Sequence, residues 1–166
     1  MPSHLLAALL LSSVAINTPQ SVQEPASLAE QDLAIAGLSS KSDTSDTKRV
    51  LGVPIARSHH EYHGNDEILH LLDWTYRDLL VSFYGDGRFY SATITGPTRV
   101  TVRGLRVRVA AQRVLALYGK HGFMNARSIT YPYRPIGPGP SNWGMIVMLD
   151  NGVVQRIVLG VIGGVD

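Results

Sequence analysis

The sequence predicts an α+β fold, and the first observation behind it is an internal similarity. Two segments are each bounded by glycines fifteen residues apart, one from Gly37 to Gly52 and the other from Gly104 to Gly119. In each segment the residues before the closing glycine favour a short helix, which a left-handed glycine ends. A tryptophan follows each segment, Trp74 after the first and Trp143 after the second.

The second observation is a hairpin signal after each tryptophan. Asp86-Gly87 separates two β-rich runs, Trp74 to Phe83 and Arg88 to Ile94, and Asn151-Gly152 separates two further runs near the end of the chain. Asp-Gly and Asn-Gly between such runs are strong signals for a tight β-turn. We therefore expect two similar helix-plus-antiparallel-hairpin repeats, with the helices packed on one face of an antiparallel sheet and the two tryptophans at matching positions.

Further residues specify the helices. Ser42, Thr44 and Ser45 offer oxygens that would cap the start of the first helix. In the second, an apolar stripe at helical spacing is expected to face the core. The stripe consists of Val107, Ala110, Val114 and Leu117.

The chain divides by composition into four parts. Residues 1–15 contain a short apolar run that ends in Ser-Val-Ala and is typical of a signal peptide, so cleavage near Ala15 is expected. Residues 16–32 are polar and are expected to form a flexible leader. The first α+β repeat is expected over 33–98 and the second over 99–166.

Composition excludes several classes of protein. Hydrophobic residues make up 45% of the 166 residues and charged residues 17%, which is enough apolar material for a core. There is no cysteine, so disulfides, thiolate metal sites and a thiol nucleophile are excluded. No apolar run approaches the length that spans a membrane as a helix.

The order of glycine, short helix, Leu-Gly-x-Pro, Trp-x-Tyr and Asx-Gly hairpin resembles a known module. It is similar to the small outer-membrane assembly lipoproteins of the SmpA/OmlA type and to the tandem-repeat β-lactamase inhibitor proteins. Val50 to Pro54, Trp74 to Tyr76 and Asp86-Gly87 carry the likeness in the first copy. The resemblance implies a helix-plus-antiparallel-sheet module outside the cytoplasm that works by binding proteins.

Charge is distributed unevenly. No acidic residue occurs between Asp86 and Asp150, and residues 99–166 carry nine Lys or Arg against two Asp. One hypothesis is an exposed basic patch for an acidic partner or an anionic lipid. The alternative is that these residues complement the acidic first half or leader of the same chain, or form a solvated face. The candidate patch consists of Arg99, Arg103, Arg106, Arg108 and Arg113.

A proline- and glycine-rich segment from Tyr131 to Pro140 is excluded as a helix or central strand. Because aromatic side chains supply much of the energy of interfaces, Tyr131, Tyr133 and Arg134 are candidate binding residues. The alternative is an ordinary long connection.

Histidines gather in the segment from His59 to His70. His59 and His63 would share one face of a helix, and with His70 they are candidate metal ligands. The alternative is a polar loop with solvated histidines. No Gly-x-Ser-x-Gly motif or phosphate-binding loop occurs, so no catalytic residue is assigned.

These observations favour a non-enzymatic protein-binding or inhibitor-like module of the cell envelope, periplasmic or secreted, that uses no cofactor. Its expected partner is an envelope or extracellular protein with an acidic surface, with anionic lipid as a further possibility and nucleic acid disfavoured. One alternative is a metal-binding protein built on the histidine cluster, with a hydrolase as one version of it. Another is a structural component of envelope assembly.

Overall fold

The computed structural model describes residues 28–63, 68–133 and 142–162. The predicted signal peptide and residues 16–27 lie outside this range. The described elements are a short 3-10 helix, two α-helices and eight β-strands. They are η1 (Glu30–Leu33), α1 (Thr44–Leu51), β1 (Ala56–His63), β2 (Ile68–Tyr76), β3 (Leu79–Tyr84), β4 (Phe89–Ile94), α2 (Ala111–Tyr118), β5 (Phe123–Met124), β6 (Ser128–Pro132), β7 (Trp143–Asp150) and β8 (Val153–Val161).

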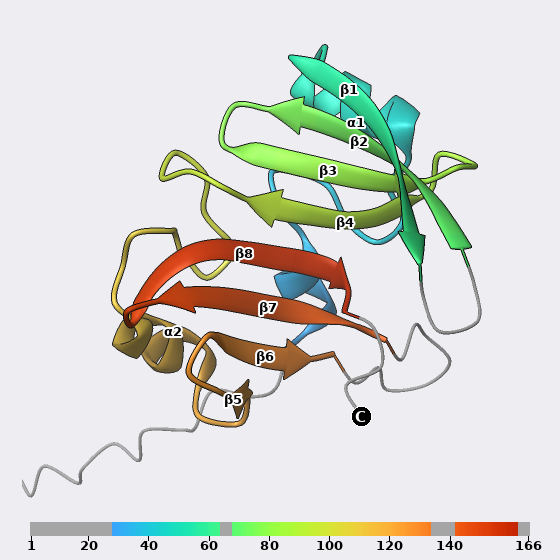
Figure 1. Ribbon diagram of the computed structural model, residues 1–166. Helices are drawn as coiled ribbons and strands as arrows, with labels where there is room; N and C mark the ends of the chain where they lie inside the picture. Colours follow the sequence, from blue (N-terminus) through green and yellow to red (C-terminus); the bar gives the residue numbers. More distant parts are fainter. Residues whose placement is uncertain (1–27, 64–67, 134–141, 163–166) are drawn as a thin grey trace, which may run out of the picture.

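All eight strands belong to one sheet in the order β1-β2-β3-β4-β8-β7-β6-β5, as Figure 1 shows. Every neighbouring pair is antiparallel. Four strands run consecutively from β1 to β4 and four from β5 to β8, and the two groups meet where β4 pairs with β8. The sheet therefore has two edges, the eight-residue strand β1 and the two-residue strand β5.

The predicted α+β fold of two helix-plus-hairpin repeats is wrong. The described residues form an eight-stranded antiparallel sheet, and each α-helix has eight residues and is followed by four strands instead of one hairpin. The expected polar loop after Pro54 is wrong, because this segment forms the strand β1. Backbone pairing with β2 holds this strand in the sheet, although its side chains are not buried.

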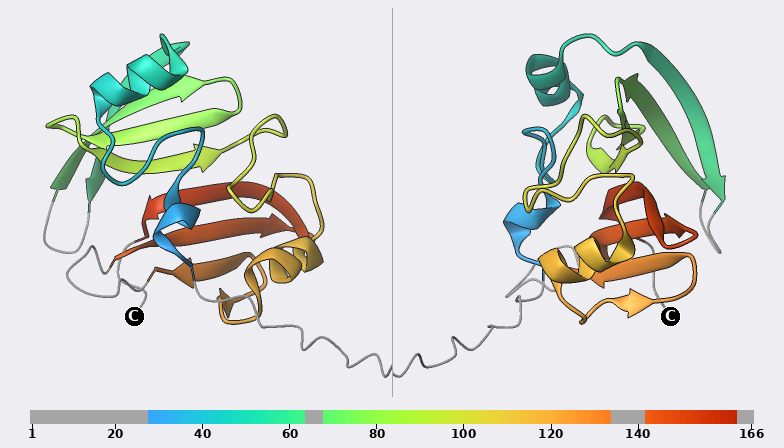
Figure 2. Two further views of the ribbon diagram at one scale, coloured as in Figure 1. Left: turned by 180° about the vertical axis from the view of Figure 1, so that it is seen from behind. Right: turned by 90° about the vertical axis from the view of Figure 1, so that its left-hand side faces the viewer.

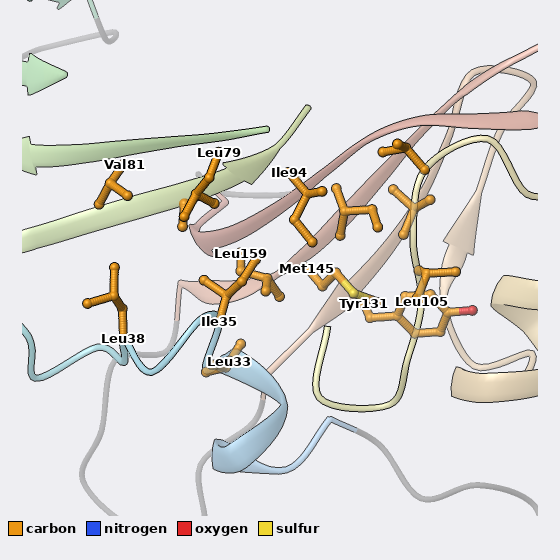
Figure 3. Packing of buried hydrophobic residues seen from close by; sticks show 14 of the residues in the cluster. Leu33, Ile35, Leu38, Leu79, Val81, Ile94, Leu105, Tyr131, Met145 and Leu159 are labelled. Carbon is orange, nitrogen blue, oxygen red and sulfur yellow. The ribbon is translucent and has the colours of Figure 1, made fainter. Parts of the chain in front are cut away.

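The helices are also not the main layer over the sheet. Thr47 is the buried residue of α1, and α2 buries Val114 and Tyr118. Instead, the segment over 28–43, which includes η1, lies across one face of the sheet, and the connection over 95–110 runs along one end of it beside the start of β8 (Figure 2, left). They contribute buried apolar side chains that meet those of the strands in a single core (Figure 3). These residues are Leu28, Leu33, Ile35, Leu38, Leu105 and Val107.

Local signals at the helix ends were partly correct. Both α-helices end at the expected glycines, Gly52 and Gly119. The capping side chain of α1 is Asp43, which accepts a hydrogen bond from the backbone N–H of Asp46, and not one of the neighbouring hydroxyls. The apolar stripe predicted for the second helix begins too early, because Val107 precedes α2 and reaches the core from the connection.

Both predicted hairpins are confirmed, with β3 paired to β4 around Asp86-Gly87 and β7 paired to β8 around Asn151-Gly152. The expected single strand from Trp74 to Phe83 is wrong, because Arg77 and Asp78 form a tight turn between β2 and β3. Trp74 therefore lies in the second strand after α1, whereas Trp143 begins the third strand after α2. The two tryptophans do not occupy matching positions.

Asp78 ties the β2–β3 turn to the connection that follows β4. Its carboxylate accepts hydrogen bonds from the Thr98 hydroxyl at 2.5 Å and from the Thr98 backbone N–H at 3.1 Å. These hydrogen bonds from Thr98 hold the pKa of Asp78 below its ordinary value. The start of the 95–110 connection is thereby fixed beside the sheet.

A substitution at Ala36 is expected to stabilise the protein. Ile35 and Leu38 exchange both backbone hydrogen bonds, at 2.9 and 2.8 Å, around a two-residue turn in which Ala36 has φ 51° and Gly37 has φ 84°. A left-handed backbone is costly for alanine and is tolerated better by asparagine, and Asn-Gly is the favoured pair for this turn. We expect A36N to raise the free energy of unfolding by about 0.5–1 kcal/mol.

Urea titration and thermal melting measure this effect. The matched control is A34N, because Ala34 has an extended backbone with φ −88° that asparagine does not improve. If A34N stabilised as much as A36N, the turn would not be the cause.

Candidate functional site

The five arginines of the candidate basic patch do not share one environment in the structure. Arg106, Arg108 and Arg113 are exposed and Arg99 is partly exposed, all of them in the 95–110 connection or in α2. Arg103 is different, because its side chain is largely buried against the N-terminal segment. It therefore does not belong to an exposed surface.

Arg103 forms a bidentate ion pair with Asp32. Its Nε and Nη2 donate to the two carboxylate oxygens at 2.7 and 2.5 Å, and its Nη1 donates to the backbone carbonyl of Leu117 at 3.1 Å. Asp32 is 1% exposed, and the guanidinium also lies 4.8 Å from the ring centre of Tyr118. For Arg103 the alternative prediction is thus correct, since it complements an acid of the predicted leader. Residues 28–32 of that leader belong to the folded domain.

The aromatic binding candidates also have structural roles. Tyr131 is buried in β6, so the exclusion of this residue from a strand is wrong. Its hydroxyl donates to the Gly119 carbonyl at 2.8 Å, and burial raises the pKa of the phenol. Tyr133 is half-buried and packs against the core. Arg134 and the following residues to Pro140 lie outside the described residues.

The histidine candidates lie on strands instead of a helix. His59 and His63 are four residues apart on β1, which places them about 13 Å apart. Glu61 approaches His70 Nδ1 at 3.4 Å and His63 Nε2 at 3.8 Å. In the described part of the chain, no group of three or more His, Asp or Glu is arranged to hold a metal ion. The predicted set of His59, His63 and His70 is therefore not brought together.

A different feature emerges from the strand register, on the face of the sheet opposite the core. Successive residues of a strand point to opposite faces. Val81, Ile94 and Met145 point into the core in Figure 3, so their neighbours point away from it. The helices and the segment over 28–43 lie on the far side of the sheet in Figure 1, so this second face is the near side; Leu71, Ser82 and Thr130 are buried on it and several of their neighbours are exposed. We call it the open face.

Seven directly paired residues cross the open face from β2 to β5, and we call them the open row. All are threonine, aliphatic or aromatic. The members are Thr75, Leu80, Thr93, Val158, Ile146, Thr130 and Phe123. Phe123 is 58% exposed, and Met148, two residues along β7 from Ile146, is 43% exposed. The open face thus carries a continuous band of apolar and β-branched side chains.

A polar cluster lies beside the open row on the same face. Asp73 accepts a hydrogen bond from the Ser82 hydroxyl at 2.6 Å, and His60 Nδ1 lies 2.9 Å from its other carboxylate oxygen. In a nucleophilic triad the histidine stands between the hydroxyl and the carboxylate. Here the carboxylate stands in the middle, so His60 does not activate Ser82. The cluster orients side chains and does not form a hydrolytic site.

Three tyrosines, Tyr62, Tyr84 and Tyr90, gather near one end of the open face, and we call them the tyrosine cluster. The rings of Tyr84 and Tyr90 are 5.2 Å apart and meet edge to face, and the Arg88 guanidinium lies 5.4 Å from the centre of the Tyr84 ring. Burial raises the pKa of Tyr90, with Tyr84 and Tyr62 adding to the effect. Leu71 is buried outside the main core, opposite His60 and Tyr84 in the strand register. Rigid tyrosines with an arginine are typical of interface hot spots.

A hollow of about 280 Å³ lies on another part of the surface, between residues 34–37 and 100–102. Its lining includes Ile35, Val100 and Val102 and contains no titratable side chain. It therefore offers an apolar surface and no groups for acid–base chemistry.

The sequence contains a signal for a second apolar face of the sheet. The strands β7 and β8 carry apolar residues at consecutive positions, such as Met145 with Ile146 and Val158 with Leu159. Strands that are apolar on both faces are usually covered on both faces. This pattern indicates a second face that requires a covering partner.

Comparison with known proteins yields no match to a family model, a curated protein or a solved structure. The resemblance to outer-membrane assembly lipoproteins and β-lactamase inhibitor proteins stays a prediction. Among the described residues, no helix combines the length and apolar character needed to cross a membrane.

Proposed function

We propose that this chain binds another protein through the open face of its sheet, without catalysing a reaction. The observation that carries the proposal is the open row. Contiguous apolar side chains on an uncovered surface mark interaction sites in soluble proteins. Leu80, Val158 and Ile146 are partly exposed and do not belong to the buried core cluster, so a partner would bury them at no cost to the fold.

The proposed partner is a protein with an acidic surface around an apolar centre. Arg156 is exposed and pairs with Met148 in the register, which puts a positive charge beside the open row. Arg106, Arg108 and Arg113 are also exposed and add to the positive charge of the domain. Charges at the rim of an interface mainly increase the association rate and select the partner. The signal-like sequence over residues 1–15 supports a partner in the envelope or outside the cell.

The test compares substitutions on the open face with a matched substitution elsewhere. F123E and I146E place a negative charge in the open row, where it would be desolvated and would repel an acidic partner. V102E is the control, because Val102 is 57% exposed, as Phe123 is 58% exposed, but lies at the hollow away from the open face. We expect both open-face variants to bind the partner at least about tenfold more weakly, and V102E to bind normally.

The partner is first captured from an envelope extract with the wild-type domain and then purified, and its Kd is measured for each variant by calorimetry. Circular dichroism confirms that each variant is folded. Normal affinity of F123E and I146E would contradict the proposal. Salt-sensitive binding to phosphatidylglycerol vesicles, with no protein captured, would favour the anionic lipid instead.

A further inference from the structure

The strand β1 is an uncovered sheet edge. All eight of its residues are exposed on both faces, and within the described residues β2 is its one hydrogen-bonded neighbour. Figure 1 shows β1 at one margin of the sheet, opposite β5. Backbone N–H and C=O groups on such an edge are a template for another strand. Exposed apolar residues lie on the same hairpin, namely Ile55, Tyr62 and Ile68.

Symmetry restricts how two copies of β1 could pair. Along an antiparallel strand, residues alternate between those whose backbone groups point to one side and those that point to the other. Two residues that face each other must both point their backbone groups toward the partner or both point them away, so in two identical strands their positions differ by an even number. A residue then lies midway between them, and in a symmetric pair this residue sits on the two-fold axis. Two registers then overlap β1 almost completely, one centred on His59 and the other on His60.

The register centred on His59 matches charge and size. Arg57 faces Glu61 of the second copy, and this pairing occurs twice. Ser58 faces His60, and Ala56 faces Tyr62, so small side chains meet large ones. In the register centred on His60, Arg57 would face His63, which carries no negative charge.

We propose that β1 pairs antiparallel with β1 of a second copy of this chain, with His59 on the two-fold axis. Glu61 already lies opposite His70 in β2, and Arg57 lies opposite Trp74 with its guanidinium 4.8 Å from the ring centre. Pairing the two edges completes a cross-strand row on one face. Its order is His70, Glu61, then Arg57 and Trp74 of the second copy. Opposite charges directly across a strand pair stabilise it.

The contact is small, and this sets the expected affinity. A seven-residue strand pair buries less than the roughly 800 Å² per partner of a standard interface. We therefore expect a Kd of about 10–100 µM. The two-fold axis is perpendicular to the sheet, so both open faces lie on the same side of a continuous sheet of twice eight strands. The pairing does not depend on the function proposed above.

Sedimentation equilibrium over about 5–500 µM at low salt measures the association, because this range brackets the expected Kd. The wild type is expected to fit a monomer–dimer equilibrium. R57E and E61R each place like charges opposite one another twice and should raise the Kd at least about tenfold. The double variant R57E/E61R restores opposite charges and should recover the Kd to within about threefold of the wild type. K48E, an exposed charge reversal on α1, is the control and should change nothing.

Cross-linking tests the register. The chain has no cysteine, so H59C introduces a single thiol. Residues that face each other across an antiparallel pair are close enough for a disulfide. H59C should form a covalent dimer under mild oxidation, and S45C, exposed on α1, should not. A monomeric wild type up to the highest concentration would overturn the proposal. So would a folded double variant that does not recover association, or equal cross-linking of H59C and S45C.

Discussion

Replacing Arg103 by alanine is expected to lower the free energy of unfolding by about 3–5 kcal/mol. The substitution leaves the Asp32 carboxylate, 1% exposed, without its bidentate partner. A buried charge that loses its partner keeps the full cost of its desolvation. The Leu117 carbonyl at the C-terminal end of α2 loses a donor as well. For a chain of this length, we expect the Tm to fall by about 10 °C.

Thermal and urea unfolding of R103A test this expectation. R106A is the matched control, because Arg106 lies three residues further along the same connection and is exposed, so its removal should change stability by less than about 0.5 kcal/mol. R103K separates charge from geometry, since lysine keeps the charge and loses the two parallel hydrogen bonds.

A second comparison distinguishes the pair from the packing around it. The double variant D32L/R103M removes both charges and fills the space with apolar atoms, which is often neutral or stabilising. We expect it to recover most of the stability that R103A loses. A loss in R103A no greater than that in R106A would show that Asp32 is solvated and that the N-terminal segment is held by its leucines alone.

The ion pair between Asp32 and Arg103 also shows why the burial of the N-terminal segment could not be predicted from the sequence. Asp32 and Arg103 are 71 residues apart, and no local pattern connects them. Asp32 was assigned to a flexible leader because its neighbours are polar, yet Leu28, Leu33 and Ile35 around it enter the core. A segment without regular structure shows no periodicity, so its burial is invisible to pattern analysis.

Local turn chemistry was the part of the fold that the sequence predicted well. Asn151-Gly152 adopts the left-handed backbone, with φ 49° and 75°, that a two-residue hairpin requires. Strand pairing was harder, because β1 is mostly polar and fully exposed and β2 begins in a region rich in histidine. The expected basic and aromatic sites depended on residue type alone, and burial removed Arg103 and Tyr131 from any exposed surface.

Consecutive apolar residues in β7 and β8 indicate a second apolar face, but the members of the open row could not be predicted because they depend on the strand register. Its members come from seven strands, and the residues that face each other are set by the pairing of strands distant in sequence, such as β4 with β8. A shift of one residue would move Val158 and Ile146 to the core face. The β4–β8 pairing therefore fixes both the core and the proposed binding surface.

The same pairing makes Gly160 the position where a single methyl group should have a large effect. Gly160 lies in β8 with φ 141°, a conformation that residues with a side chain rarely adopt. A Cβ placed there would lie 2.4 Å from the Tyr90 carbonyl oxygen and 2.6 Å from Ser91 Cα, both in the backbone of β4. Backbone atoms of a paired strand cannot rotate away as a side chain can. We therefore expect G160A to lower the free energy of unfolding by about 3–5 kcal/mol, as the sum of overpacking and backbone strain.

The control for G160A measures the free-energy cost of backbone strain without the steric crowding. Gly104 also has a positive φ, 79°, but nothing lies within 4 Å of the position of an added Cβ. G104A should therefore cost about 1–2 kcal/mol, from conformational strain alone. Urea titration of both variants gives the two free energies, and their difference measures the crowding between β4 and β8. Because this pairing joins the two groups of four strands, G160A should also lower the cooperativity of unfolding, seen as a smaller m-value. Equal losses in G160A and G104A would mean that β4 and β8 move apart freely, and that the open row is not held in a fixed register.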